Sequence, residues 1–227
     1  MKLTALEAAR LIDISAVRTH SSYNDIIALA DLARKYKFIN VHTLPSWTKT
    51  LAQMLADVQD VYVGAPVGFP SGGHTCDVKL AEAKQLIDHG VQEMDIVMNV
   101  GRFKNKEYGY VLNELTHIID MASEKKILTK VIIEQNVLTD SEVEEACALV
   151  INSGADFIKT GTGWVPGDAG IDRVRRIKEL CGSKIKVKAA GGIRSPQEFL
   201  ALYDMGVERM GINAKSAVEI VEYFGLH

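Results

Sequence analysis

Residues 151–163 read INSGADFIKTGTG, in which an amphipathic segment ends at a glycine and a short apolar run follows. The same layout recurs at 87–101 (IDHGVQEMDIVMNVG) and at 203–214 (YDMGVERMGINA). Each copy carries a glycine at the position just after the helix, where a left-handed backbone conformation favours glycine. The apolar runs are short and apolar on both faces, which is typical of parallel strands buried between two layers. The stretch therefore predicts a repeated helix-then-strand unit.

Eight segments are predicted as strands, and helical patterns lie between nearly every pair and after the last. These segments are 10–15, 38–43, 60–67, 92–98, 128–135, 155–160, 184–189 and 208–212. Eight strand–helix units in 227 residues are typical of an α/β protein folded as a single TIM (β/α)8 barrel. A doubly wound open sheet is the alternative, because periodicity does not reveal closure. We expect residues 1–227 to form one domain, since no linker or low-complexity tract interrupts them.

Composition and charge exclude several classes of partner. The net charge of −3 at pH 7 gives no reason to expect nucleic acid or an anionic membrane as a partner. No apolar run reaches the roughly 18–20 residues that a membrane-spanning helix needs, and the N-terminus lacks the core of a signal peptide. The three cysteines lie far apart without a CxxC pair, so we expect a reducing, cytoplasmic setting.

Polar side chains stand near the predicted carboxyl ends of several strands, where the active site of an α/β barrel is built. They are Asp13, His42, Asp95, Glu134, Lys159 and Lys188. Asp95 lies within an apolar strand, and a buried carboxylate is costly unless a cation pairs with it. The two lysines end neighbouring strands and could supply that cation.

Two lysines and a carboxylate at one end of a barrel favour Schiff-base catalysis. A lysine has a pKa of about 10.4, so it attacks a carbonyl only when burial or a second cation lowers that pKa. A carboxylate beside the imine then moves the carbon-bound proton, directly or through water. The alternative is that each lysine merely ends a strand in solvent and that Asp95 is a structural hydrogen-bonding partner. Position alone does not single out Lys188, because KIKVK (184–188) places three lysines on one face.

Other motifs give weaker signals. GGIRS (191–195) runs into a predicted helix start, whose free N–H groups could bind phosphate, although a tight turn would need the same glycines. GTGWVPG (161–167) has a GxGxxxG spacing instead of the GxGxxG of a dinucleotide site, and a proline interrupts it. The six histidines show no HxH, HxxxH or HExxH spacing, so we expect neither a metal nor a cofactor.

Four motifs together resemble a known family, the class I deoxyribose-phosphate aldolases. In chain order they are EMDIVMNVG (93–101), KVIIEQNVLT (130–139), ADFIKTGTG (155–163) and VKAAGGIR (187–194). The likeness covers nearly the whole chain. It implies a TIM barrel that reversibly cleaves 2-deoxyribose 5-phosphate into acetaldehyde and glyceraldehyde 3-phosphate without a metal.

The resemblance implies roles for individual residues. Lys159 would form the Schiff base, and Lys188 would be the second lysine that perturbs it. Asp95 would relay protons, and Asp13 would pair with Lys188. Contacts to the substrate and its phosphate are expected from a second set: His42, Thr160, Trp164, Gly191, Gly192, Arg194, Gly211 and Asn213.

Four positions depart from the family pattern. His42 stands where the family commonly has cysteine, and Trp164 stands where some members have a lysine that helps to hold phosphate. Asn213 and Ala214 replace a serine pair that also holds phosphate. The catalytic core therefore matches while the phosphate end differs.

These departures leave two alternatives open beside the family reaction. The first is an aldolase of the same mechanism with another, or an unphosphorylated, aldehyde pair. The second is a non-catalytic sugar-phosphate-binding barrel. The resemblance also implies a small-molecule partner and a homodimer.

Overall fold

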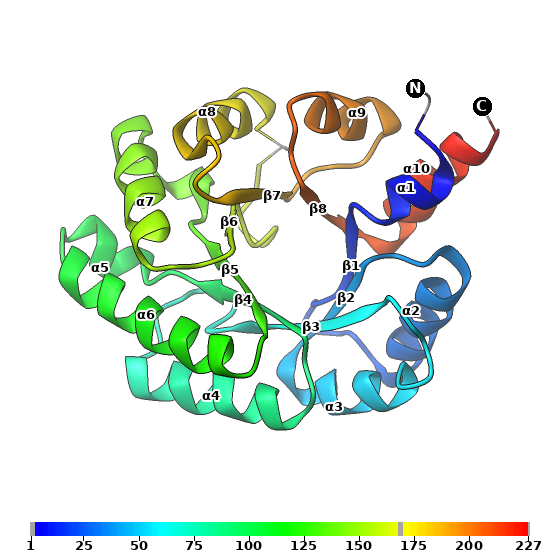
Figure 1. Ribbon diagram of the computed structural model, residues 1–227, viewed down its shortest axis with the longest axis horizontal. Coiled ribbons are helices and arrows are strands. Elements are labelled where there is room, and N and C mark those ends of the chain that lie inside the picture. The colour runs from blue at the N-terminus through cyan, green and yellow to red at the C-terminus, as the bar shows by residue number, and fades with distance from the viewer. Residues whose placement is uncertain (1–2, 168–169, 227) are drawn as a thin grey trace.

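The computed structural model, which describes residues 3–167 and 170–226, contains a closed barrel of parallel strands (Figure 1). The strands follow one another around the barrel in chain order: β1 (Ile12–Ala16), β2 (Asn40–Thr43), β3 (Tyr62–Val67), β4 (Glu93–Val97), β5 (Leu128–Ile132), β6 (Phe157–Lys159), β7 (Lys186–Ala190) and β8 (Arg209–Asn213). The barrel closes because β8 also pairs in parallel with β1, with Asp13 opposite Gly211. Closure confirms the predicted TIM barrel and rules out the doubly wound open sheet.

Helices surround the barrel on the outside (Figure 1). They are α1 (Ala5–Ala9), α2 (Tyr23–Tyr36), α3 (Pro45–Met54), α4 (Cys76–Asp88), α5 (Val100–Lys104), α6 (Tyr108–Glu124), the 3-10 turn η1 (Gln135–Val137), α7 (Asp140–Asn152), α8 (Ile171–Cys181), α9 (Pro196–Asp204) and α10 (Ala214–Leu226). The first and last helices lie side by side, which brings the two ends of the chain together. Within the described ranges, none of the helices combines the length and apolar character that crossing a membrane requires.

The predicted helix-ending glycines adopt the conformation expected of them. Gly90, Gly154 and Gly206 follow α4, α7 and α9, and their φ angles are +86°, +80° and +77°. A residue with a Cβ is strained in this region, so glycine lets the chain leave the helix and turn directly into the next strand. The repeated junction seen in the sequence is therefore the turn that connects a helix to the next strand of the barrel.

Each predicted strand overlaps an observed one, but the fifth ends early. It was expected to reach residue 135, whereas β5 ends at Ile132. Glu134 adopts a left-handed conformation (φ 52°, ψ 61°) and leads into η1. This conformation cannot continue a strand, and it turns the chain towards the mouth of the barrel.

Alternation along the strands separates two environments. On β4, Met94 and Ile96 belong to the hydrophobic core between the barrel and its helices. Glu93 and Asp95 point the other way, because successive side chains of a strand face opposite sides. The barrel interior is therefore charged, while the layer around it is apolar.

Candidate active site

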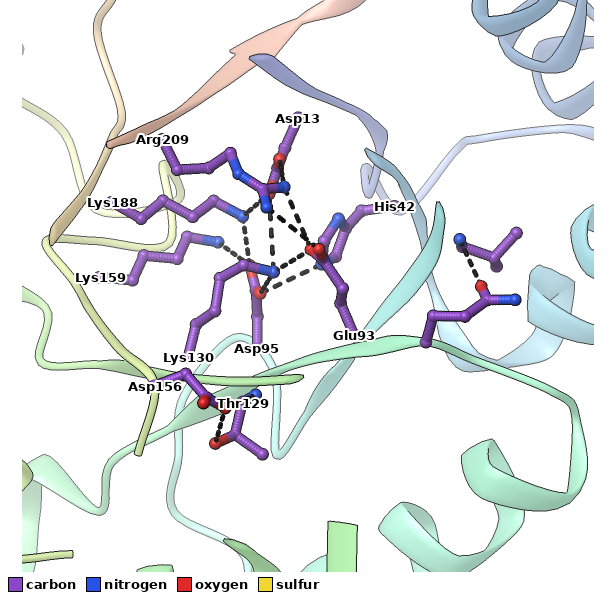
Figure 2. A network of polar contacts seen from close by, with 12 residues as sticks. Asp13, His42, Glu93, Asp95, Thr129, Lys130, Asp156, Lys159, Lys188 and Arg209 are labelled. Atoms are coloured by element: carbon purple, nitrogen blue, oxygen red, sulfur yellow. Dashed lines mark hydrogen bonds and ion pairs between the residues drawn. The ribbon is translucent and has the colours of Figure 1, made fainter. Parts of the chain in front are cut away.

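A cluster of charged side chains from six strands fills the interior of the barrel (Figure 2). It contains Asp13, Glu93, Asp95, Lys130, Lys159, Lys188 and Arg209, each at most 8% exposed. The three carboxylates come from β1 and β4, and the four cations come from β5, β6, β7 and β8. One cation therefore has no matching carboxylate of its own.

Asp95 is the centre of the upper part of this cluster. Its Oδ2 atom lies 2.8 Å from Lys159 Nζ and 2.7 Å from Lys188 Nζ. Its Oδ1 atom lies 3.1 Å from Lys130 Nζ and 3.2 Å from His42 Nε2. Burial acts to raise the pKa of Asp95, but these four neighbours together hold it well below its usual range. Asp95 is therefore a permanent carboxylate.

The two predicted active-site lysines differ in their surroundings. Lys188 is 1% exposed and contacts two carboxylates, Asp13 at 2.5 Å and Asp95 at 2.7 Å. Burial nevertheless outweighs these contacts and lowers the pKa of Lys188 from 10.5 to about 8. Lys159 is 8% exposed and, among the described residues, forms an ion pair with Asp95 alone. Lys159 is thus the more accessible and less restrained amine.

The structure also distinguishes Lys188 from the two lysines that precede it on the same face. Lys184 and Lys186 are exposed, and Lys186 lies at the start of β7. Only Lys188 reaches the charged cluster.

The lower part of the cluster was missed in the sequence. Arg209 lies 2.7 Å from Asp13 and 3.1 Å from Glu93, and Lys130 pairs with Glu93. Burial lowers the pKa values of Lys130 and Arg209, but the adjoining carboxylates raise them above their ordinary values. Both remain charged and support Asp13 and Asp95 from below. The spacing of Glu93 and Asp95, two residues apart on one strand face, was the available signal.

A cavity of about 520 Å³ opens above the cluster at the carboxyl ends of the strands. Its lining includes all four predicted catalytic residues, Asp13, Asp95, Lys159 and Lys188. It also includes seven of the predicted binding residues: His42, Trp164, Gly191, Gly192, Arg194, Gly211 and Asn213. Burial lowers the pKa of His42 below its usual range.

Two predicted binding residues have side chains already engaged elsewhere. Thr160 does not line the cavity: it is fully buried, and its hydroxyl bonds the backbone of Ala190, donating at 3.2 Å and accepting at 3.0 Å. The hydroxyl therefore links β6 to β7, and a role for Thr160 in binding stays a prediction. Asn213 does line the cavity, but its carboxamide caps α10 through Ser216.

Glu134 fixes the loop that follows Lys159. Its carboxylate is 5% exposed and accepts hydrogen bonds from the amide (3.2 Å) and the hydroxyl of Thr162. A Cβ on Gly161 would lie 2.8 Å from Glu134 Oε1, so a larger residue at that position would have to displace the Glu134 carboxylate. The strand-end glycine therefore lets the carboxylate approach the backbone beside Lys159.

A closed parallel barrel with a partly accessible lysine amine at the floor of a polar cavity is typical of TIM-barrel enzymes that use lysine as a nucleophile. The sequence model of the family described as "DeoC/LacD family aldolase" matches residues 19–214, and the chain belongs to that family. It is accordingly a carbon–carbon lyase that works through a lysine Schiff base.

Individual relatives are similar to this chain over almost its full length. A deoxyribose-phosphate aldolase of Klebsiella pneumoniae is 37% identical over 229 residues, covering 100% of this chain and 91% of the relative. One of Rhizobium meliloti is 41% identical over 219 residues, covering 96% and 88%. The solved structure of the Aeropyrum pernix deoxyribose phosphate aldolase, described as tetrameric, matches with a TM-score of 0.90 at 26% identity over 97% of this chain and 92% of that one.

Proposed function

We propose that this protein reversibly cleaves 2-deoxyribose 5-phosphate into acetaldehyde and glyceraldehyde 3-phosphate. Two named relatives that span nearly the whole chain, both deoxyribose-phosphate aldolases, support this choice of substrate. The cavity of about 520 Å³ also lies within the roughly 300–1,000 Å³ typical of small-molecule sites.

Lys159 is the proposed nucleophile. The observation that carries this assignment is that Lys159 combines partial exposure to the cavity with a single carboxylate contact. Lys188 is held by two carboxylates and is almost fully buried. The charge balance allows such a neutral amine without selecting which lysine it is, because loss of one lysine proton leaves three cations facing three carboxylates. A neutral amine is therefore compatible with this interior.

The reaction follows from an amine at that position. Lys159 Nζ attacks the C1 aldehyde of the open-chain sugar, and loss of water gives a protonated imine. The C3 hydroxyl then loses its proton, the C2–C3 bond breaks, and its electron pair flows into the imine to form an enamine. Glyceraldehyde 3-phosphate leaves at this step. Protonation of the enamine carbon and hydrolysis of the imine release acetaldehyde and restore the amine.

The proton steps are assigned to Lys188 and Asp95 acting through water. With a pKa of about 8, Lys188 can release and regain a proton near neutral pH, as an acid–base catalyst requires. Asp95 stays ionised and orients both lysines at hydrogen-bonding distance. Asp13 pairs with Lys188 and keeps it in place.

Borohydride trapping tests this assignment. Reduction of the enzyme in the presence of acetaldehyde is expected to leave a stable adduct, which peptide mass spectrometry should locate on Lys159. The variant Lys159→Met should lose the adduct, whereas Lys186→Met, an exposed lysine on the adjacent strand, should keep it. Absence of an adduct, or an adduct on another residue, would overturn the mechanism.

A second candidate is an aldolase of the same mechanism acting on an unphosphorylated aldehyde pair. Trp164 favours it, because this uncharged ring lines the cavity where some family members have a lysine. A cleavage assay that compares 2-deoxyribose 5-phosphate, 2-deoxyribose and longer sugars decides between the two. Equal rates with and without phosphate would favour the second candidate.

We also propose a homodimer working in the cytoplasm. The tetrameric relative supports self-association in general, and Cys76, Cys147 and Cys181 are free thiols, as a reducing compartment allows. Light scattering coupled to size-exclusion chromatography gives the assembly state, and a monomer mass would contradict the dimer. Cell fractionation tests the location.

A further inference from the structure

Two arginines at the mouth of the cavity have no carboxylate partner among the described residues. Arg18 follows β1 and Arg194 follows β7, and both line the cavity that contains Lys159. Most other arginines of the chain form ion pairs, as Arg34 does with Asp57 and Arg176 with Glu144. Unpaired guanidinium groups facing a cavity are available to an anionic ligand.

Arg18 is held in place by the loop that follows Lys159. Its Nη2 atom donates a hydrogen bond to the carbonyl of Gly163 at 3.2 Å, and its guanidinium carbon lies 5.7 Å from the centroid of the Trp164 ring. A guanidinium has five N–H donors, so this single hydrogen bond leaves most of them unused. Cation–π stacking fixes the plane of the group.

Trp164 joins the two loops. Its indole Nε1 donates to the carbonyl of Val17 at 3.2 Å, and its amide donates to Thr162 Oγ1 at 3.0 Å. Phe69 packs edge-on against the ring, with centroids 5.8 Å apart. The indole therefore fixes the segment that carries Arg18 against the segment that carries Lys159. Preorganisation of this kind reduces the ordering cost when a ligand binds.

The charges lining the cavity are distributed along its depth. Among the described residues, its carboxylates are Asp13 and Asp95, which belong to the buried cluster, and Glu134, which is bound to Thr162. The mouth has the two arginines. A substrate bound through its aldehyde at Lys159 would therefore meet positive charge at its far end.

We propose that Arg18, positioned by Trp164, binds the phosphate of the substrate and determines the preference for phosphorylated sugars. This proposal rests on the proposed function. Arg18 would supply the positive charge that a lysine at position 164 supplies in some family members. The cation comes from the loop after β1 instead of the loop after β6, and Arg194, in the loop after β7, is the second guanidinium that lines the cavity.

The test compares Arg18→Gln with wild type on phosphorylated and unphosphorylated 2-deoxyribose. Loss of one charge-assisted contact at an exposed site should lower kcat/KM for the phosphorylated sugar about 10-fold. The value for the unphosphorylated sugar should change less than about 2-fold, because that substrate lacks the group Arg18 contacts. Arg175→Gln on α8, an exposed arginine outside the cavity lining, is the matched control and should behave as wild type.

A charge-relocation variant adds a readout that misfolding cannot imitate. Trp164→Lys in the Arg18→Gln background puts a cation back on the cavity wall, and it should recover much of the preference for the phosphorylated sugar. Equal losses on both sugars in Arg18→Gln, or no loss on either, would overturn the proposal. Failure of the double variant to recover any preference would count against it as well.

A binding measurement separates this inference from the proposed function. Calorimetric titration with inorganic phosphate needs no turnover, and Arg18→Gln should bind phosphate about 10-fold more weakly than wild type. If wild type cleaves the phosphorylated sugar but both proteins bind phosphate equally, Arg18 is wrongly assigned and the function stands. If wild type forms no Lys159 adduct while phosphate binding still depends on Arg18, the anion site stands and the aldolase assignment fails.

Discussion

Replacement of Lys188 by methionine should make the protein more stable while removing its activity. Methionine keeps the length of the side chain but not the charge, and it leaves three cations facing three carboxylates inside the barrel. Asp13 still has Arg209 at 2.7 Å, and Asp95 still has Lys159 at 2.8 Å. No carboxylate is left without a partner, so the usual cost of breaking a buried ion pair does not apply.

The magnitude follows from the pKa of Lys188. Burial lowers this pKa from 10.5 to about 8, and that difference corresponds to about 3 kcal/mol of unfavourable free energy for the charged form. As pH rises, the folded protein releases this proton before the unfolded chain does. The cost is therefore constant below about pH 8, and wild type regains stability between about pH 8 and 10.5. Lys188→Met lacks this dependence.

Equilibrium unfolding in urea at pH 7 and pH 10 measures the effect. At pH 7 we expect Lys188→Met to be more stable than wild type by up to about 3 kcal/mol. At pH 10 the difference should be smaller by about 2–3 kcal/mol. Lys186→Met, on the same strand but exposed, is the control and should show no such change with pH.

Two results would refute this reasoning. The first is a variant that is clearly less stable than wild type at pH 7. The second is a stability difference that is the same at both pH values. A cleavage assay on the same samples should show that the more stable variant no longer turns over the substrate.

Three further changes test other parts of the structure. Gly161→Ala puts a Cβ 2.8 Å from Glu134 Oε1. The resulting shift of the loop beside Lys159 should lower kcat/KM about 10- to 100-fold. Wild-type kinetics in this variant would contradict the prediction. Lys79→Met leaves the fully buried Glu114 without the cation now 2.5 Å away and should cost about 3–5 kcal/mol of unfolding free energy. Adding Glu114→Leu should restore most of that free energy. Equal stabilities of the single and double variants would show that the loss does not come from the unpaired carboxylate. Ser195→Ala removes the oxygen that caps α9 and should cost about 1 kcal/mol in a thermal or urea melt, while Ser195→Asp should retain the cap; a loss shared by both variants would argue against capping.

The fold could be predicted from the sequence because its helix-to-strand turns depend on a few neighbouring residues. A glycine such as Gly154 is demanded by a backbone conformation that a few neighbouring residues determine. Closure of the barrel depends instead on pairing between β1 and β8 at opposite ends of the chain. Counting eight units favoured that outcome, but no local pattern contains it.

The site was only half readable, for a related reason. Asp95, Lys159 and Lys188 stand at strand ends, where barrel enzymes place their chemistry, so position drew attention to them. Glu93, in contrast, lies deeper, at the start of its strand. Its partners are distant in the sequence, and only the closed barrel brings them within reach.

Arg18 was missed because its environment is made by two loops. Its contact with Gly163 joins residues 145 positions apart, and loop geometry has no periodicity from which to predict it. The orientation of Thr160 was not readable for the opposite reason. A family motif located it correctly in the chain, but the motif does not say which side of the strand its hydroxyl faces.

The separation of charge by strand has a consequence for how the molecule assembles. Carboxylates of the cluster belong to the half of the chain from β1 to β4, and its cations belong to the half from β5 to β8. Either half collapsing alone would gather like charges in a medium that screens them poorly. The two halves are thus complementary, because each supplies the charges that neutralise the buried charges of the other. Charge neutralisation and barrel closure therefore occur together as one cooperative event. A half-formed barrel is disfavoured by the repulsion between its unpaired buried charges.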